Sequence, residues 1–382
     1  MPDQAADQSP DLSILASFSG EGGVERMILN LVNAFAGRGL QVHLLLIKTR
    51  SRHLSELHPA IKVIELGGRH TATSLLPLIR YLRTWHPCCL LAAKDRAGRL
   101  AVLARLLART PTHLVVRLGT NLSAALAHRS SSKLWLRRAA IRLLYPCIDR
   151  IIAVSEGVKQ DTVTVAGIDP DRIEVVRNPV ITSRMLELAQ GAPTHPWLDT
   201  SQTPVMLAAG RLTVQKDFAT LIRAFAILRE NRPCKLIILG EGRQKAKLQA
   251  LAAELGVAEA VDLPGFTTNP YACMSRADLF VLSSRWEGSP NVLTEAMALG
   301  TPVVSTDCPS GPREILADGR HGPLVPVGDW QALAMAMQQV LDAPPDSDSL
   351  REAVREYAVE TSTSRYLEIL GVTRELSHAA VD

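Results

Sequence analysis

The stretch Leu279–Gly300, LFVLSSRWEGSPNVLTEAMALG, decides the fold that we expect for this chain. Its first residues, Leu279–Leu282, form a short apolar run of the kind that predicts a buried strand. A polar loop, Arg285–Pro290, follows the strand. A helix then begins near Asn291 with one broad apolar face, and Gly300 stands where helices commonly end. The stretch therefore predicts a strand, a loop and a helix in direct succession.

Two carboxylates flank this junction. Glu287 lies in the loop, and Glu295 lies eight positions later in the first turns of the helix. The first amides of a helix have no partner within the helix, so a strand-loop-helix junction of this kind is suited to bind an anion. We therefore interpret the junction as half of a ligand site.

The same strand-helix alternation fills most of the chain. It predicts strands at Leu12–Phe18, Val42–Ile47, Ile61–Leu66, Cys88–Ala92, His113–Val116, Arg150–Val154 and Ile173–Val176, and again at Val205–Ala209, Lys235–Leu239, Ala260–Leu263, Leu279–Leu282, Pro302–Ser305 and Leu324–Val325. Such alternation is typical of parallel sheets that helices cover on both faces. We therefore predict an α/β protein with two doubly wound domains facing across a cleft, which binds ligands at the carboxyl ends of its strands.

The alternation lapses once, and this lapse sets the predicted domain boundary. Residues 1–183 form the first predicted domain, residues 184–203 a Pro- and Gly-punctuated linker, and residues 204–354 the second domain. The C-terminal helix, at about residues 355–382, can pack back on the first domain.

Composition excludes several classes of protein. The 382 residues carry a net charge of only +4, which does not favour a nucleic-acid partner. The six cysteines show no CxxC spacing, so reduced thiols are expected. The polar N-terminus does not resemble a secretory signal, and no apolar run reaches the length of a membrane span. We expect a cytoplasmic protein that can lie peripherally on the inner face of the cytoplasmic membrane.

Positive charge is concentrated between Lys94 and Arg150, where twelve Lys and Arg residues face only Asp95 and Asp149. A basic amphipathic helix is predicted at about Ser132–Leu144. Its predicted basic edge consists of Lys133, Arg137 and Arg138, and its apolar remainder of Trp135, Ala139, Ile141, Leu143 and Leu144. Two interpretations remain open. The helix can pack on a sheet with its basic edge in water, or it can lie on an anionic membrane surface.

Four further loops follow predicted strands of the second half. Gly210–Lys216 places Arg211 and Lys216 where they could clamp a diphosphate. Gly240–Gly242 allows a close backbone approach, and Pro264–Thr267 and Asp307–Glu314 follow the next strands. The alternative is that such charges are solvated and bind no ligand, which is the interpretation we favour for Arg243 and Lys245.

These motifs together resemble glycosyltransferase family 4, whose fold is GT-B, with two Rossmann-like domains. Glu287-x7-Glu295 is similar to the family's E-x7-E signature, and Gly210-Arg211-Leu212…Lys216 is similar to its phosphate clamp. Gly20-Glu21-Gly22-Gly23-Val24-Glu25-Arg26 resembles its N-terminal Gly-rich loop. The Ser310–Glu314 loop is similar to that of subgroups that build bacterial surface glycans from hexose or N-acetylhexosamine donors. The resemblance covers residues 12 to about 330.

The resemblance implies a site and a reaction. A sugar would move, with retention of configuration and without a metal or other cofactor, from a nucleotide-sugar donor, expected to be UDP-linked, to a glycan or lipid-linked acceptor. The implied catalytic residues are Arg211, Lys216 and Glu287, which would hold the diphosphate and the sugar. The other implied donor-binding residues are Gly22, Gly23, Gly210, Gly242, Phe266, Thr267, Gly288, Ser289, Pro290, Asn291, Val292, Leu293 and Glu295. Glu295 would bind the ribose, and Phe266–Thr267 would flank the base.

The acceptor side departs from the family pattern. Many relatives carry a His in the loop after the strand that corresponds to His113–Val116, whereas this chain has Arg117-Leu118-Gly119-Thr120-Asn121. Either Arg117 or Asn121 makes the acceptor contact, or no such group exists here. The alternatives for the whole protein are a sugar-nucleotide epimerase of the same fold and a non-catalytic nucleotide-sugar-binding protein.

Two other sequence patterns do not support a further function. Asp169-Pro170-Asp171 and Asp346-Ser347-Asp348 have the Asp-x-Asp spacing that holds metal in another glycosyltransferase fold, but neither follows a predicted strand. We interpret both as surface turns. Neither half opens with G-x-G-x-x-G after its first strand, which disfavours a nicotinamide dehydrogenase.

Overall fold

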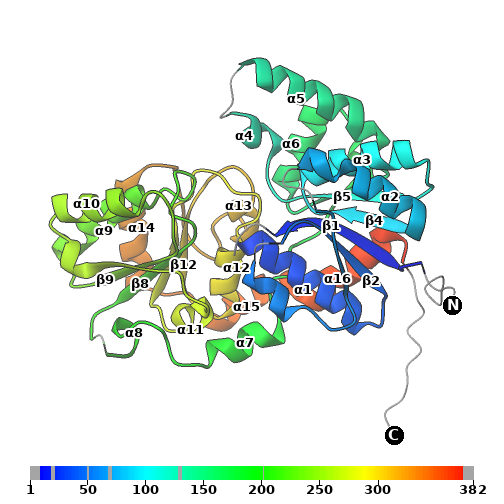
Figure 1. Cartoon of the computed structure of the whole chain (residues 1–382). Helices are drawn as coiled ribbons and strands as arrows, with labels where there is room; N and C mark the ends of the chain where they lie inside the picture. The colour runs from blue at the N-terminus through cyan, green and yellow to red at the C-terminus, as the bar shows by residue number, and fades with distance from the viewer. Residues whose placement is uncertain are drawn as a thin grey trace, which may run out of the picture. The chain divides into compact units, whose positions relative to one another are not determined.

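The computed structural model describes residues 9–18, 22–49, 51–67, 71–127, 131–200 and 202–372, which divide into two compact units (Figure 1). Unit 1 holds the described residues up to Ala153, those from Lys159 to Val176 and those from Val359 onward. Unit 2 holds Val154–Val158 and Arg177–Ala358. The main boundary thus lies at residue 176 rather than at the predicted residue 183.

Unit 1 is built on a seven-stranded parallel sheet with the order β3-β2-β1-β4-β5-β6-β7. Its strands are β1 (Leu12–Phe18), β2 (Val42–Thr49), β3 (Lys62–Glu65), β4 (Cys89–Ala92), β5 (His113–Leu118), β6 (Arg150–Ala153) and β7 (Ile173–Val175). The chain winds outward from β1 in one direction and then from β4 in the other. Right-handed crossovers therefore put the helices on both faces.

The helices of unit 1 form two layers. They are α1 (Gly23–Gly37), α2 (Leu75–Trp85), α3 (Asp95–Ala108), α4 (Leu122–Ala127), α5 (Ser131–Leu144), α6 (Glu156–Ala166, whose first turn belongs to unit 2) and α16 (Val359–Leu370), with short 3-10 turns at Arg52–Glu56, Thr71–Ser74, Tyr145–Cys147 and Pro170–Arg172. Helices α1 and α16 pack together on one face, and α2, α3 and α5 cover the other (Figure 1).

Unit 2 has a six-stranded parallel sheet with the order β10-β9-β8-β11-β12-β13. Its strands are β8 (Val205–Ala209), β9 (Lys235–Leu239), β10 (Val261–Gly265), β11 (Leu279–Leu282), β12 (Val303–Thr306) and β13 (Leu324–Val325). Numbered within the unit, this is the 3-2-1-4-5-6 order of the doubly wound Rossmann fold. The strand order reverses between β8 and β11, which is the point where such sheets bind ligands.

Alternation along each strand of unit 2 feeds two separate cores. On β8, Met206 and Ala208 face the core under α9, α10 and α14, whereas Val205, Leu207 and Ala209 face the core under α7, α11, α12 and α15. Both sides are apolar because helices cover both faces, as the sequence predicted. The helices are α7 (Ser183–Ala189), α8 (Trp197–Thr200), α9 (Phe218–Asn231), α10 (Lys245–Glu254), α11 (Pro270–Met274), α12 (Asn291–Ala298), α13 (Pro312–Ile315), α14 (Trp330–Asp342) and α15 (Ser347–Ala353), with 3-10 turns at Ala258–Ala260 and Arg355–Tyr357.

The segment 184–203 is not an extended linker. It contains most of α7 and all of α8, and it belongs to unit 2. Met185 and Ala189 are buried in the core beneath α11, and Asn269 Nδ2 donates to the carbonyl oxygen of Leu188 at 2.8 Å. These contacts outweigh the helix-breaking residues that mark the segment in the sequence.

Candidate functional site

The loops after β8 and β11 lie next to each other at the carboxyl end of the unit 2 sheet, because these two strands are paired. Their contacts are direct. Ser283 Oγ donates to the carbonyl oxygen of Lys216 at 2.8 Å, and Gln215 Nε2 donates to that of Trp286 at 2.9 Å. The amide of Arg285 donates to the carbonyl oxygen of Gln215 at 2.8 Å. The two loops therefore form one connected wall.

Lys216 and Glu287 meet within this wall. Lys216 Nζ lies 2.6 Å from Glu287 Oε1, and Ser284 Oγ donates to the same oxygen at 2.7 Å. The side chains of Lys216 and Glu287 are only 16% and 9% exposed. A partly buried ion pair is screened less than a surface pair, so the two charges hold each other in place.

Arg211 presents a different environment. Its side chain is exposed, and within the described part of the chain we find no carboxylate paired with it. Leu212, the next residue, is fully buried and anchors the loop. The predicted clamp therefore combines a fixed ammonium group with an exposed guanidinium group.

Three glycines shape the loops after β8 and β9. Gly210 has a φ of +152°, and a Cβ there would lie 2.9 Å from Lys216 Cε. Gly240, with a φ of +130°, leaves no room for a Cβ beside the carbonyl oxygen of Gly210. A Cβ on Gly242 would overlap the carbonyl oxygen of Leu212. The close approach that we predicted for Gly242 is thus already made by the neighbouring loop.

The residues that open α12 are placed at the same edge. Pro290 is the N-cap, Gly288 is buried, and Ser289 is partly buried. Asn178 Nδ2 donates to Asn291 Oδ1 at 2.8 Å. Of the amides predicted to face the ligand, that of Leu293 donates to the carbonyl oxygen of Pro290 at 3.0 Å, so it is used within the helix.

The remaining donor-side residues lie on α12 and after β10. Val292 is partly buried, and the Leu293 side chain is fully buried in the core. Glu295 is 7% exposed, so both members of the E-x7-E pair are largely buried. Phe266, which follows β10, is 43% exposed. The Thr267 hydroxyl lies 3.3 Å from that of Thr194.

Cys308 reports on the electrostatics of the site. It is buried, and burial together with the negative charge of Glu287 raises the pKa of its thiol to about 12. The thiol is therefore protonated at neutral pH and unsuited to act as a nucleophile.

On unit 1, the described part of the Gly-rich loop is Gly22 and Gly23, while Gly20 and Glu21 lie outside the described residues. Gly22 is the N-cap of α1, and a Cβ there would lie 2.9 Å from Glu25 Oε2. Glu25 is 7% exposed and pairs with Lys94 Nζ at 3.5 Å. Glu25 lies in the first turn of α1, and Lys94 follows β4. Sequence reasoning missed this pair, although Glu25 belongs to the Gly-rich motif.

Arg117 was predicted to lie in a loop, but it lies within β5. It is 2% exposed and lies beside Tyr366 of α16, which is fully buried. Gly119 leaves room for the guanidinium group, since a Cβ there would come within 2.6 Å of Arg117 Nη1. Asn121 is also buried, at 8% exposure. Their burial favours a structural role over direct contact with an acceptor.

Helix α5 does not present the whole of the predicted basic edge to solvent. Arg137 points inward, with Nη2 2.9 Å from Asp95 Oδ2, and Arg99 and Tyr145 contact the same carboxylate. The two guanidinium groups outweigh burial and lower the pKa of Asp95. Arg137 therefore does not belong to a basic outer edge. The side chain of Lys133 lies outside the described residues.

Apolar side chains of α5 instead face outward. Trp135, Leu136 and Leu143 are 70%, 61% and 74% exposed. Leu103, Leu106 and Leu107 of the adjacent α3 are also exposed. Exposed arginines accompany them at positions 96, 109, 138 and 142. We call this set of residues the outer face. None of the helices in the described part of the chain has both the length and the apolar character that crossing a bilayer requires.

The Asp-x-Asp triplets are surface turns, as predicted. Asp169 caps the Pro170–Arg172 turn, and Asp346 caps α15. Within the described ranges, no three His, Cys, Asp or Glu side chains gather closely enough to hold a metal ion.

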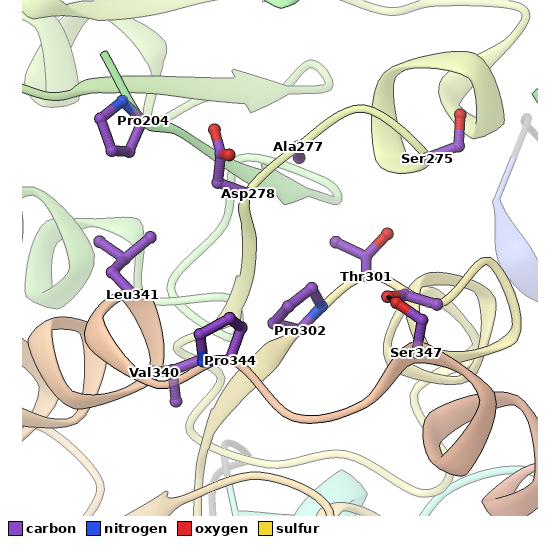
Figure 2. Close-up of a pocket in the computed structure, with 11 residues that line it drawn as sticks. Pro204, Ser275, Ala277, Asp278, Thr301, Pro302, Val340, Leu341, Pro344 and Ser347 are labelled. Atoms are coloured by element: carbon purple, nitrogen blue, oxygen red, sulfur yellow. Dashed lines mark hydrogen bonds between the residues drawn. The ribbon is translucent and has the colours of Figure 1, made fainter.

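A cavity of about 340 Å³ lies at the opposite end of the unit 2 sheet (Figure 2). Pro204, Asp278 and Pro302 line it, and each directly precedes a strand. The Asp278 carboxylate accepts a hydrogen bond from the amide of Val205 at 2.8 Å. Because this group serves the sheet and the site loops leave the other end, we assign the cavity no role in the chemistry.

Two protein families match this chain, one in each half. Residues 21–184 match the family described as Glycosyltransferase Family 4, and residues 197–360 match Glycosyl transferases group 1. The N-acetylgalactosamine-N,N'-diacetylbacillosaminyl-diphospho-undecaprenol 4-alpha-N-acetylgalactosaminyltransferase of Campylobacter jejuni is 31% identical over 91% of this chain and 93% of its own length. The chain belongs to glycosyltransferase family 4.

A further relative and a solved structure of similar fold support this assignment. The lipopolysaccharide core biosynthesis glycosyltransferase LpsE of Rhizobium meliloti is 29% identical over 92% of the chain and 97% of its own length. Among solved structures, Anabaena Alr3699/HepE in complex with UDP and glucose has a TM-score of 0.78 at 18% identity, covering 95% of this chain and 100% of that one. This likeness shows the fold, which is GT-B, as the sequence predicted.

Proposed function

We propose that this glycosyltransferase moves a hexose or N-acetylhexosamine from a UDP-linked donor to a glycan or lipid-linked glycan acceptor, with retention of configuration, in cell-surface polysaccharide or lipopolysaccharide synthesis. The names of the Campylobacter and Rhizobium relatives support the acceptor class, and the UDP complex of the Anabaena protein supports the nucleotide. The observation that carries the proposal is the Lys216–Glu287 pair at the reversal of strand order, with exposed Arg211 on the same loop.

In the proposed reaction, the bond between the anomeric carbon and the diphosphate oxygen breaks, and its electron pair leaves with UDP. The acceptor oxygen forms the new bond and passes its proton to the departing diphosphate oxygen. Arg211 and Lys216 supply the positive charge that stabilises the leaving diphosphate, so the proposal needs no metal. The opening turn of α12 adds its partial positive charge.

Glu287 is suited to hold the donor sugar. Lys216 and Ser284 both contact Oε1, so Oε2 is the atom that would accept a sugar hydroxyl. We assign the ribose to Glu295 and the base to Phe266 and Thr267. On unit 1, Gly22 and Gly23 would approach the phosphates and the acceptor, while Arg117 and Asn121 support that side from within.

We also propose that the enzyme works at the inner face of the cytoplasmic membrane, with the outer face on anionic lipid. Exposed tryptophan and leucine beside arginine are typical of interfacial helices. The charge is complementary, because Asp95 is the only acidic residue between Glu65 and Asp149, and its contacts with Arg99 and Arg137 compensate it. A membrane location would suit a lipid-linked acceptor.

The decisive experiment is a donor screen followed by turnover. Thermal shift should select a UDP-sugar over GDP-sugars, since a ligand at a hundredfold its Kd adds about 2.7 kcal/mol of stability. UDP release should then require an acceptor such as a polyprenol-diphosphate-linked sugar or a lipopolysaccharide core oligosaccharide. NMR of the product should show the donor's anomeric configuration.

Two other outcomes would favour the alternatives. Conversion of the UDP-sugar without any acceptor would indicate an epimerase. UDP binding without UDP release under any acceptor would indicate a binding protein.

A further inference from the structure

The carboxylate of Glu314 accepts three hydrogen bonds, yet the proposed reaction does not use it. The amides of Glu156 and Gly157 donate to it at 3.0 Å each, and Arg177 Nη1 donates at 2.7 Å. Its side chain is 21% exposed. All three donors belong to unit 2, and two of them open helix α6. A carboxylate is well placed there, because unpaired amides and the helix dipole both favour negative charge.

The loop that carries Glu314 is pressed against the first turn of α6. A Cβ on Gly157 would overlap the Ser310 hydroxyl oxygen and would lie 3.1 Å from Ser310 Cα. Ser310 and Gly311 both have positive φ angles, of 66° and 86°. A glycine adopts this conformation readily, but Ser310 must be held in it by its surroundings. The hydrogen bonds of Glu314 anchor the same loop four residues later.

The other side of the same loop supports the donor loop. A Cβ on Gly311 would lie 2.8 Å from the carbonyl oxygen of Gly288 and 3.1 Å from Ser289 Cα. The amide of Glu287 lies 3.5 Å from the carbonyl oxygen of Pro309. The segment Pro309–Gly311 is thus a wall behind the residues proposed to hold the donor sugar.

Arg177 extends the arrangement to a second contact with the donor loop. Its guanidinium carbon lies 5.8 Å from the ring centre of Tyr357. The Tyr357 hydroxyl lies near the Ser289 side chain. Glu314 and its partner Arg177 therefore reach the donor loop by two routes.

We propose that Glu314 is a positioning residue, which holds the Pro309–Gly311 wall and so keeps Glu287, Gly288 and Ser289 in register with the donor sugar. The inference rests on the proposed function, because it assigns the sugar to this loop. It makes a selective claim. In the proposed function, the diphosphate lies mainly against the loop after β8 and the base against the loop after β10. Loss of Glu314 should therefore impair recognition and transfer of the sugar far more than binding of UDP.

The test compares UDP with the UDP-sugar that the donor screen retains, for example UDP-galactose or UDP-N-acetylgalactosamine. Glu314→Ala should lower both kcat and the ratio of UDP-sugar to UDP affinity roughly tenfold, as loss of a charge-assisted hydrogen bond does. The Kd for UDP should stay within about twofold. Glu314→Gln, which keeps the size and accepts amide hydrogen bonds, should recover part of both losses.

Glu356→Ala is the matched control, because Glu356 is the other acid beside Arg177 and is 76% exposed, with no contact to the wall. It should leave kcat and the affinity ratio unchanged. Equal weakening of UDP and UDP-sugar binding in the Glu314 variants would show a merely structural role and overturn the inference, as would an unchanged ratio and kcat. If Glu314→Ala does not fold, Glu314→Gln decides alone. Absence of UDP binding by the unaltered chain would instead overturn the proposed function.

Discussion

Lys216 Nζ lies 2.6 Å from Glu287 Oε1, although the two residues are 71 positions apart and follow different strands. The pair fixes the ammonium group before any donor arrives. A diphosphate can therefore bind a charge whose position is already set, and little side-chain entropy remains to be lost. Glu287 at the same time gains a neutralising partner, which keeps a carboxylate stable at 9% exposure.

Removing either cation of the clamp should weaken donor binding. We expect Arg211→Ala and Lys216→Ala each to weaken the free energy of donor binding by about 1.5–3 kcal/mol, which is the usual cost of losing hydrogen bonds to a charged group. Lys216→Ala should also lower the Tm, because it leaves Glu287 buried with Ser284 but no cation. Arg211→Ala should leave the Tm unchanged, since Arg211 is exposed. Calorimetric titration with UDP and thermal melts measure both effects.

Arg243→Ala serves as the control for these variants, because Arg243 is an exposed cation of the same unit for which we predict no ligand. Its UDP affinity should match that of the unaltered chain. Wild-type UDP affinity in both clamp variants would show that the diphosphate lies elsewhere.

The glycine after β9 should tolerate no side chain. Gly240→Ala would force a Cβ onto the carbonyl oxygen of Gly210 at a φ of +130°. We expect it to lower the free energy of unfolding by about 2 kcal/mol or more and to weaken UDP binding, because Gly210 begins the clamp loop.

Gly37→Ala is the matched comparison, because it makes the same substitution at a glycine where a Cβ has free space. Gly37 lies at the end of α1, and a Cβ there would meet nothing within 4 Å. We expect Gly37→Ala to raise the free energy of unfolding by about 0.4–1 kcal/mol. Equal stability of the two variants in urea unfolding would contradict the packing argument.

The sequence predicted the strands because they follow from local rules. Val205–Ala209 was predicted with its observed bounds, since five apolar residues in a row are what a strand buried on both faces requires. The meeting of Lys216 with Glu287 could be anticipated in outline, because loops that leave neighbouring parallel strands share one edge. The ion pair itself could not, since it depends on side-chain directions.

Other features depended on partners distant in the chain. Helical periodicity showed that α5 has two faces but not which one is buried. That was decided by Asp95, which lies 42 positions before Arg137 and draws it inward. Arg117 was placed in a loop because the apolar run appeared to end at Val116, but a buried tyrosine of α16 accommodates it within the strand.

Membrane binding through the outer face should depend on anionic lipid. Replacing Arg96 and Arg138 together by alanine should weaken binding to phosphatidylglycerol vesicles by about 2 kcal/mol, at about 1 kcal/mol for each charge. Trp135→Ala with Leu143→Ala should weaken it independently of salt, because that contribution is apolar. Vesicle sedimentation at low and high salt distinguishes the two contributions.

Arg365→Ala is the matched control, since Arg365 is 57% exposed on α16, which packs with α1 on the other face of the unit 1 sheet. Its vesicle binding should equal that of the unaltered chain. Equal binding of the unaltered chain to neutral phosphatidylcholine vesicles, or no binding to either kind, would rule out an anionic membrane as the partner.

Stability should fall in acid because of His43 on β2. Its Nδ1 lies 2.9 Å from the Tyr81 hydroxyl, and burial, with the charge of Lys62, lowers its pKa from 6.5 to about 4. The folded state thus binds the proton less tightly than the unfolded state. The resulting stability is fully present above pH 6.5 and is lost as the pH falls toward 4, by about 2–3 kcal/mol. His43→Asn, which does not titrate, should flatten the pH dependence of urea unfolding between pH 7.5 and 4.5, whereas Tyr81→Phe should retain most of it. An unchanged slope in His43→Asn would assign the acid sensitivity to other groups.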